Sequence, residues 1–300
     1  MRLNKYISHN TGYSRRDADK LIEAGEVTLN KKVLKDFAYE VQEGDKIYIK
    51  GKPIKKRQSN EVTVVVYNKP KGVLVTKKDD RGRTTIYHKL PGKFRHFIPV
   101  GRLDYASEGL LLLTDSPGVA QALMESRQLD RTYNIKIDKP VTKEMMEAMQ
   151  EGIVLEDATA GAHEKSKITS MEFAPFAYYE IRSEGKNFTK LRVTITEGKN
   201  RELRRFFAHF GTKVLDLKRV AFGGIELNNL PENKTRYFTR KEYEELHEFM
   251  KRKKKNATIS EKNDLNTQKQ RAQSRKKSSQ EEDSLAEFKK EIKEAFKRFK

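Results

Sequence analysis

The pattern of apolar and polar positions divides the chain into three parts. The first, residues 1–60, carries apolar residues at helical spacing over residues 2–9 and again after Ser14, which with Asp17 forms a capping-box signature. Residues 26–30 and 46–50 then alternate in the manner of short strands. Residues 52–60, KPIKKRQSN, indicate a polar linker. We therefore predict a small helix-helix-hairpin domain at 1–60.

The second part, residues 61–250, mixes short strands with amphipathic helices. An apolar run at 110–113 is too short for a membrane span and predicts a buried strand. Strands are predicted at both sides of 68–72 and at 131–137, 168–173, 178–182 and 190–196, with helices at 116–126 and 142–150, after Asn200, and from Thr239. Because regular β-α alternation is rare here, we expect an α+β domain with a mixed, mainly antiparallel sheet and flanking helices.

Two details of that domain bear on its core and its last helix. The aromatic residues Phe206, Phe207 and Phe210 recur at helical spacing, which predicts core positions rather than base-stacking platforms. Glu242 completes a capping box with Thr239 at the start of the last helix.

The third part, residues 251–300, is polar and strongly charged. It holds 17 Lys and Arg against 8 acids, so it carries nearly half of the chain's net charge of +20. Such a composition predicts a basic, mostly disordered tail. Apolar residues from Leu285 to Phe299 nevertheless share one helical face. This stripe predicts a terminal amphipathic helix, which could dock on the second part of the chain, bind RNA or bind a partner.

The net charge of +20 points to a polyanionic partner, because Lys and Arg gain affinity by releasing the counterions condensed on nucleic acid. An anionic membrane is the rival interpretation. No apolar run approaches the roughly 18 residues of a spanning helix, however, and the N-terminus has no signal-peptide core. We therefore expect a cytoplasmic protein with no membrane partner.

The sequence offers no evident cofactor site. There is no cysteine, which excludes thiolate nucleophiles and disulfides. No two of the six histidines have the spacing of a helical metal site, and neither GxxxxGK[ST] nor GxGxxG occurs. We expect no metal, no nucleotide cofactor and no other cofactor.

The candidate chemistry lies in residues 100–115, VGRLDYASEGLLLLTD, where a polar turn leads into the predicted buried strand. Asp104 would stand at the mouth of that strand, in a loop tethered to the sheet interior, where scaffolds often hold reacting groups. On spacing alone a capping or turn aspartate is the more common case, because single acids are frequent in turns that contain glycine.

The same stretch resembles the signature of the RsuA/RluB branch of RNA pseudouridine synthases. Further matches follow in the family's order: NKPKG at 68–72, RTY at 131–133, GKNRELRRF at 198–206 and LKRVAFG at 217–223. The resemblance implies that Asp104 is catalytic, that Tyr133 stacks on the uracil, and that Arg204 pairs with Asp104. Glu202 stands where the family usually has glutamine.

Residues 3–30 are similar to the alpha-L RNA-binding module first described in a ribosomal small-subunit protein. That resemblance places Arg2, Lys5, Ser14, Arg15, Arg16 and Lys20 on an RNA-binding face, and Arg15 and Arg16 stand at a helix N-terminus, where phosphate is favoured. A solvated basic face is the simpler alternative. Asn68, Lys69 and Arg102 are further candidates for contact with the substrate RNA.

Together these observations predict a monomeric enzyme that converts uridine to pseudouridine in ribosomal RNA, most simply in the large subunit. Small-subunit ribosomal RNA or tRNA as the substrate, and a non-catalytic RNA-binding or ribosome-assembly factor, remain the alternatives. Cleavage of the bond between C1′ and N1 builds positive charge at C1′, which one carboxylate can trap or stabilise. Whether Asp104 attacks C1′ or removes a proton from C2′ stays open.

Overall fold

The computed structural model describes residues 1–11, 13–54, 62–126, 129–185, 187–253 and 255. It divides into two units, Met1–Glu242 and Tyr243–Lys300, and each is described by itself. Within the first unit, two separate hydrophobic clusters lie on two separate sheets, one near the N-terminus and one in the larger region after residue 62. The predicted domain boundaries at 60 and 250 stay predictions.

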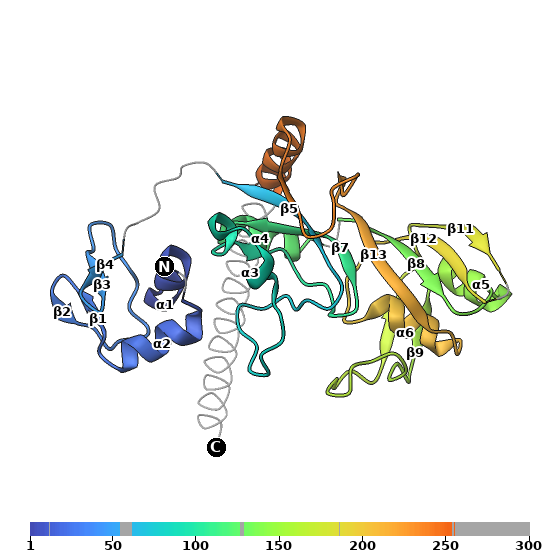
Figure 1. Cartoon of the computed structure of the whole chain (residues 1–300), viewed down its shortest axis with the longest axis horizontal. Coiled ribbons are helices and arrows are strands. Elements are labelled where there is room, and N and C mark those ends of the chain that lie inside the picture. Colours follow the sequence, from blue (N-terminus) through green and yellow to red (C-terminus); the bar gives the residue numbers. More distant parts are fainter. Residues whose placement is uncertain (12, 55–61, 127–128, 186, 254, 256–300) are drawn as a thin grey trace, which may run out of the picture. The chain divides into compact units, whose positions relative to one another are not determined.

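The N-terminal region pairs two helices with a small sheet (Figure 1). Its elements are α1 (Leu3–Asn10), α2 (Arg15–Glu23), β1 (Val27–Leu29), β2 (Lys32–Val33), β3 (Ile47–Ile49) and β4 (Lys52–Pro53), and the strand order is β2-β1-β3-β4. The capping box at Ser14 and Asp17 is present as predicted. Leu3, Ile7 and Ile22 are fully buried and pack with Val27 of β1, so the apolar stripes of both helices close one small core.

The larger region is built on one mixed sheet in the order β11-β12-β8-β13-β7-β5-β15, with β14 beside β13 and β6 beside β7 (Figure 1). Its strands are β5 (Val64–Lys69), β6 (Ile98–Pro99), β7 (Glu108–Thr114), β8 (Arg131–Ile137), β11 (Tyr178–Glu184), β12 (Thr189–Ile195), β13 (Val214–Phe222), β14 (Ile225–Glu226) and β15 (Thr235–Tyr237). Among the described strands, β13 and β7 pair in parallel, and the other pairs of this sheet are antiparallel. The predicted mixed, mainly antiparallel sheet is confirmed.

Helices and loops complete this region. They are α3 (Ile86–Lys89), the 3-10 turn η1 (Gly92–Phe94), α4 (Pro117–Met124), α5 (Lys143–Glu151) and α6 (Glu202–His209), with the small sheet of β9 (Ile153–Leu155) and β10 (Met171–Phe173). Phe206 and Phe207 of α6 are fully buried in the main core, and Phe210 packs against it, so the prediction of core aromatics is confirmed. α6 lies against β13 of the sheet (Figure 1).

One row of the sheet links the strands around Asp104. Tyr133 of β8 faces Arg219 of β13, and Arg219 in turn faces Gly109 of β7. A Cβ atom at Gly109 would lie 2.2 Å from the carbonyl oxygen of Arg219, and its φ is +103°, so only glycine fits there. The absence of a side chain at Gly109 therefore lets β7 and β13 approach closely just after the Asp104 loop.

Three sequence predictions need correction, and one strand was missed. Residues 73–76 after the NKPKG turn form no strand, because Leu74 makes only an isolated bridge to Thr85. The strand predicted at 168–173 is reduced to β10. Asn200 does not cap α6; the N-cap is Arg201 at φ +53°, while the Glu202 carboxylate accepts a hydrogen bond from Lys199 N. The nine-residue strand β13 was not predicted, because its outward side is polar and its inward side includes Arg219.

The last described helix starts at Arg240 and continues to Lys253. Glu242 N binds Thr239 Oγ1 and Thr239 N binds the Glu242 carboxylate, which confirms the predicted capping box. No helix among the described residues is long and apolar enough to cross a membrane. The apolar stripe from Leu285 to Phe299 and nearly all of the predicted tail lie outside the described residues.

Candidate active site

The loop of residues 104–107 is held by its backbone carbonyl groups. The carbonyl of Asp104 accepts from Lys69 Nζ at 3.2 Å, and that of Tyr105 accepts from the Gly72 amide at 2.8 Å. The Ala106 carbonyl accepts from Arg204 Nη2 at 3.1 Å, and the Ser107 carbonyl from Lys69 Nζ at 2.8 Å. Four successive carbonyls therefore have donors from elsewhere in the fold, which fixes the backbone under the Asp104 side chain.

Lys69 is the central donor to that loop. Its side chain is fully buried at the end of β5, and its Nζ donates to the carbonyls of Pro70, Asp104 and Ser107. An ammonium group has three N–H donors, so each carbonyl takes one of them. Burial lowers the pKa of Lys69 to about 8, while the charges of Asp104 and Glu108 act in the opposite direction.

The Asp104 carboxylate remains accessible above this fixed backbone. Its side chain is 34% exposed, and its Oδ2 lies 3.5 Å from Nη1 of Arg201, whose side chain is 22% exposed. Arg201 Nε also donates to the carbonyl of Gly161 at 2.7 Å, which orients the guanidinium. The family resemblance predicted that an arginine of the GKNRELRRF segment pairs with Asp104. The structure has such a pair, but the arginine is Arg201 and not the predicted Arg204.

Arg204 makes its hydrogen bonds to the loop and to β13 rather than to the carboxylate. It donates to the carbonyls of Val214 and Ala106 and, at 3.4 Å, to Ser107 Oγ. Burial lowers the pKa of Arg204 and the neighbouring Arg201 lowers it further, while the charges of Asp104 and Asp216 act in the opposite direction. A guanidinium with several fixed donors suits this bridging position, since it joins α6, the start of β13 and the Asp104 loop.

Arg205 secures the segment that contacts Arg201. It is fully buried and donates to the backbone carbonyls of Asn200, Ala158 and Ile168 and to Ser166 Oγ. Gly161 belongs to the same segment and has a φ of +72°. Residues 158–168 are therefore tied to α6 through Arg205, and this segment in turn supplies the carbonyl that orients Arg201.

Tyr133 lies on the same buried face of the sheet as α6. It is 8% exposed and belongs to the main core cluster, where it neighbours Arg219 and Val193 on the adjoining strands. Strands lie about 4.8 Å apart, so its backbone is roughly 10 Å from that of Gly109, two strands away. The structure therefore brings Asp104, Arg201 and Arg204 together, and places Tyr133 in the adjoining row without a hydrogen bond to them.

The predicted RNA contacts divide into exposed and buried residues. Arg102 is exposed two residues before Asp104, as RNA contact requires. Asn68 is 4% exposed and donates to the Leu230 carbonyl, and Lys69 is fully buried. Their polar groups are used inside the protein, so the structure corrects the assignment of Asn68 and Lys69 to RNA contact. Their sequence signal was a Lys-containing turn, which does not distinguish a solvated lysine from a buried one.

The N-terminal cations lie at the surface. Arg2, Lys5 and Arg15 line one hollow of about 380 Å³, together with Met1, Asn4 and Glu40. Arg16 and Lys20 are exposed on α2, whereas the Ser14 hydroxyl is bonded to Asp17 in the capping box. This arrangement is suited to phosphate contact by the five basic residues, and Ser14 has a structural task as the N-cap.

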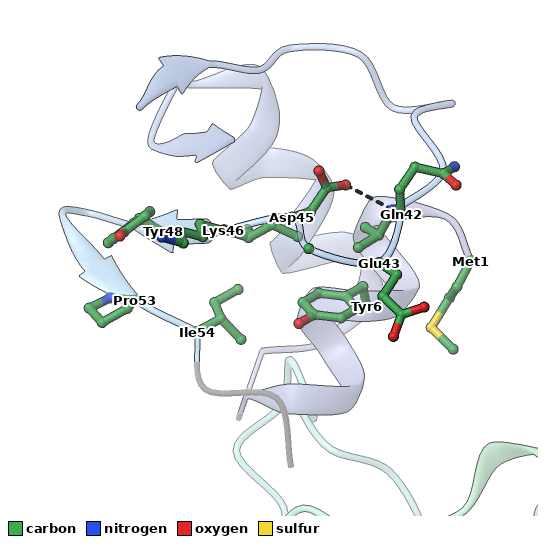
Figure 2. A pocket seen from close by; sticks show the side chains of 12 residues that line it. Met1, Tyr6, Gln42, Glu43, Asp45, Lys46, Tyr48, Pro53 and Ile54 are labelled. Atoms are coloured by element: carbon green, nitrogen blue, oxygen red, sulfur yellow. Dashed lines mark hydrogen bonds between the residues drawn. The ribbon is translucent and has the colours of Figure 1, made fainter. Parts of the chain in front are cut away.

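A second hollow of about 470 Å³ lies in the same N-terminal region, on the side of β3 and β4 (Figure 2). Tyr6, Tyr48 and Ile54 give it apolar walls, while Asp45 and Glu43 add negative charge. The Asp45 carboxylate accepts from Gln42 N and Tyr39 Oη, and these bonds lower its pKa. That carboxylate is therefore held by hydrogen bonds within the N-terminal region. Among the described residues, no group of three His, Cys, Asp or Glu could hold a metal ion.

Sequence reasoning missed three residues of this site: Arg201, Lys69 in its buried role, and Arg205. Arg201 stands three residues before Arg204 in a run of basic residues, and composition does not show which arginine points where. Lys69 comes two residues after the continuous apolar run VVVY at 64–67, and this run was the available sequence signal that its strand is buried on both faces. Arg205 stands two residues after Leu203 and one before Phe206, spacings that predict a side chain pointing away from their helical face, so the structure corrects the expectation that it projects away from the core.

Comparison with known proteins agrees with this geometry. Residues 63–209 match the model of the RNA pseudouridylate synthase family, and residues 1–47 match the S4 domain. An uncharacterized RNA pseudouridine synthase of Helicobacter pylori (strain J99) is 52% identical over 83% of this chain and 95% of the relative. Ribosomal large subunit pseudouridine synthase B of Bacillus subtilis is 33% identical over 82% of this chain and 95% of the relative.

Two further comparisons extend this result. The dual-specificity RNA pseudouridine synthase RluF of Escherichia coli (strain K12) is 31% identical over 83% of this chain and 79% of the relative. A crystal structure of a pseudouridylate synthase matches with a TM-score of 0.55 and 28% identity, over 82% of this chain and 99% of the other. The chain belongs to the RNA pseudouridine synthase family, with an N-terminal S4 domain, and is an enzyme of that class.

Proposed function

We propose that this enzyme isomerises a specific uridine of large-subunit ribosomal RNA to pseudouridine, with Asp104 as its catalytic residue. The observation that carries the proposal is the contrast within one loop. The backbone carbonyls of residues 104–107 all have donors, while the Asp104 carboxylate stays 34% exposed beside Arg201. A rigidly held but accessible carboxylate is what a reacting group requires, because positioning in advance lowers the barrier of the chemical step.

The chemistry follows from the charge that develops at the sugar. As the bond from C1′ to N1 breaks, C1′ becomes positive, and the Asp104 carboxylate either bonds to it or removes the C2′ proton. The uracil leaves as an anion, so no second carboxylic acid is needed to protonate it. It returns through C5: the C1′–C5 bond forms as the bond from C1′ to Asp104 breaks, or as the proton taken from C2′ is given back. The C5 proton is then lost and N1 takes up a proton. Arg201, whose Nη1 lies 3.5 Å from Asp104 Oδ2, keeps the carboxylate oriented.

Tyr133 is proposed to stack on the target uracil after that base leaves its helix. A phenol ring combines a flat apolar face with a polar tip. The side chain is 8% exposed, so we expect the residues packed around it to move apart when the flipped nucleotide enters. Taking a base out of its stack costs a few kcal/mol, which contacts to the rest of the RNA must offset.

The proposed RNA contacts lie at Arg102 and in the S4 domain, on Arg2, Lys5, Arg15, Arg16 and Lys20. Arg2, Lys5 and Arg15 line one hollow, and Arg16 and Lys20 are exposed on α2. The Bacillus subtilis relative is named for the large ribosomal subunit, which supports the choice of substrate. We expect the protein to act as a monomer in the cytoplasm, where ribosomal RNA is modified.

A second substrate is the leading alternative, because the Escherichia coli relative is named as dual-specific. The experiment that tests both is the mapping of pseudouridines in ribosomal RNA and tRNA from a strain lacking this protein and from its parent. The proposal predicts the loss of a pseudouridine from large-subunit ribosomal RNA, restored by the wild-type chain but not by a chain carrying Asp104→Asn. Loss confined to small-subunit RNA or tRNA contradicts the proposed substrate, and no loss anywhere contradicts the proposed function.

A further inference from the structure

The catalytic sheet has two unlike faces. On β8 the residues Tyr133, Ile135 and Ile137 are buried on the side of α6, while Asn134 and Lys136 point to the opposite side and are partly exposed. β12 repeats this alternation, with buried Leu191 and Val193 on the side of α6. Since neighbours in register share a face, the outward side chains of β12, β8 and β13 form one continuous surface.

Four cations occupy this surface. Lys190 of β12 faces Lys136 of β8, and Arg192 of β12 faces Asn134, which in turn faces Lys218 of β13. We name Lys136, Lys190, Arg192 and Lys218 the outer basic face. Lys190 is exposed and the other three are half-buried. β11, β12, β8 and β13 follow one another in the sheet, so the four cations span neighbouring strands (Figure 1).

The pairing of Lys190 with Lys136 is unfavourable in the free protein. Like charges directly opposite each other on antiparallel strands destabilise a sheet. The ring of Phe188 offsets part of this repulsion, since its centroid is 4.1 Å from Lys136 Nζ and 5.8 Å from Lys190 Nζ. An anion bound between the two ammonium groups would remove the remaining repulsion.

The acids closest to this surface are largely engaged elsewhere. Asp216 of β13 faces Lys136 across the sheet, but its carboxylate makes an ion pair with Lys71. Glu180 of β11 faces Arg192, but its carboxylate pairs with Arg182 Nε at 3.1 Å.

The outer basic face thus keeps a net positive charge. Glu108 of β7 is in register with Lys218 and reduces the charge at that end. Within the part of the chain that the structure describes, none of the four cations makes an ion pair with an acid. The surface is therefore most positive around Lys136, Lys190 and Arg192.

We propose that the outer basic face is a second RNA-binding surface, which contacts backbone phosphates of the substrate RNA on the face of the sheet opposite to Tyr133. Charge complementarity selects a polyanion, and the proposal rests on the proposed function for the choice of RNA. Phe188 adds an aromatic ring between two cations, which suits the edge of a nucleic-acid strand better than a simple anion. A structured ribosomal RNA is large enough to reach both faces of one sheet.

The test compares two full-length variants with the same loss of charge. The first carries Lys136→Gln, Lys190→Gln, Arg192→Gln and Lys218→Gln. The control carries Lys89→Gln, Lys143→Gln, Arg95→Gln and Lys234→Gln, four exposed cations of the same region that lie off the outer basic face. Binding is measured to a fragment of ribosomal RNA that contains the modified uridine. The KCl concentration is varied from about 50 to about 300 mM, because salt in this range screens contacts to phosphate.

We expect the first variant to bind about tenfold more weakly at 0.1 M salt and to flatten the slope of log K against log salt by about 3, because each phosphate contact adds roughly 0.7 to 0.9. The control should change the slope by less than about 1. The melting temperature of the first variant should equal or exceed that of the wild type, because a like-charge pair is removed. Equal losses of affinity in the two variants, or no loss in the first, would overturn the proposal.

Two further measurements separate this proposal from its rivals. If the first variant binds RNA normally but loses binding to vesicles with anionic lipid, the surface belongs to a membrane and the RNA proposal is wrong. Conversion of uridine by the wild-type enzyme is recorded on the same RNA. If the wild type converts no uridine while the first variant alone loses RNA affinity, the proposed function fails and the second RNA-binding surface stands.

Discussion

Arg201 Nη1 lies 3.5 Å from Asp104 Oδ2, while Arg204, three residues later, donates to the backbone of the same loop at the Ala106 carbonyl. Two arginines at the start of one helix thus have different tasks: Arg201 faces the carboxylate and Arg204 holds the chain beneath it. This difference arises from the backbone, because Arg201 is the N-cap at φ +53° and its side chain leaves the helix in another direction.

The division of tasks predicts different kinetic defects. Arg201→Gln removes the charge beside Asp104 and should lower kcat by about 10²-fold with little change in RNA affinity, since a charged partner in the site is lost. Arg201→Lys should recover part of the rate, because an ammonium keeps the charge but loses the bond to the Gly161 carbonyl. Single-turnover rates and binding constants of the two variants decide this.

Arg204→Gln is the matched comparison. It also removes the hydrogen bonds to the carbonyl groups of Ala106 and Val214. It should therefore lower the melting temperature in addition to the rate. The account is contradicted if Arg201→Gln has a normal rate while Arg204→Gln has a normal melting temperature and a large kcat defect. Arg204, rather than Arg201, would then be the ion-pair partner of Asp104.

The protonation of Lys69 should affect kcat and the free energy of unfolding in opposite directions as the pH rises. Its pKa in the folded protein is about 8, below its ordinary value of 10.5. Between these values the unfolded chain binds the proton more tightly, so the contribution of Lys69 to stability rises with pH through this window. The neutral amine, however, has two N–H donors for three carbonyls, which loosens the Asp104 loop.

We therefore expect kcat to fall as the pH rises through about 8. The free energy of unfolding should increase between pH 8 and 10.5. Lys69→Met should remove both trends, and it should lower the rate at every pH because three buried carbonyls lose their donor. Denaturant unfolding and single-turnover rates across this range are the measurements. Identical pH profiles for the wild type and Lys69→Met would contradict the account of this residue.

Most of the fold was predictable from sequence, and much of the site was not. The buried strand β7, the capped helices α2 and α4, and the aromatic core of α6 follow local rules of periodicity and capping. The burial of the cations Lys69, Arg205 and Arg219 does not follow such local rules, because a buried charge depends on carbonyl groups that distant segments supply. Such carbonyls have no signature in the sequence, so Lys69 looked like a solvated turn residue.

The two basic ends predict separable effects on RNA. Removing residues 251–300 takes away about +9 of charge, so binding at low salt should weaken and the salt slope flatten, with the modified uridine unchanged. Removing residues 1–60 takes away Arg2, Lys5 and Arg15 and should reduce activity on the natural substrate far more than binding to generic RNA. A lower melting temperature or a different modified uridine after truncation at Lys251 would show that the tail is structural or determines specificity.

The chemistry is expected to run without an added cofactor. The chain has no cysteine, and carboxylate trapping of C1′ needs neither a metal nor a nucleotide. The purified enzyme should therefore convert prefolded RNA in EDTA at the same rate as in Mg²⁺. An absolute requirement for a divalent ion in the chemical step, with RNA folding controlled, contradicts this expectation.

The most direct test of the account is the rate of pseudouridine formation by Asp104→Asn on the natural ribosomal RNA, with binding measured in parallel. The substitution keeps the shape and the loop contacts, which involve the backbone carbonyl, and removes the carboxylate. We predict that conversion is abolished while RNA affinity stays within about twofold of the wild type. Conversion above a few per cent of the wild-type rate by the purified variant would remove Asp104 from the mechanism.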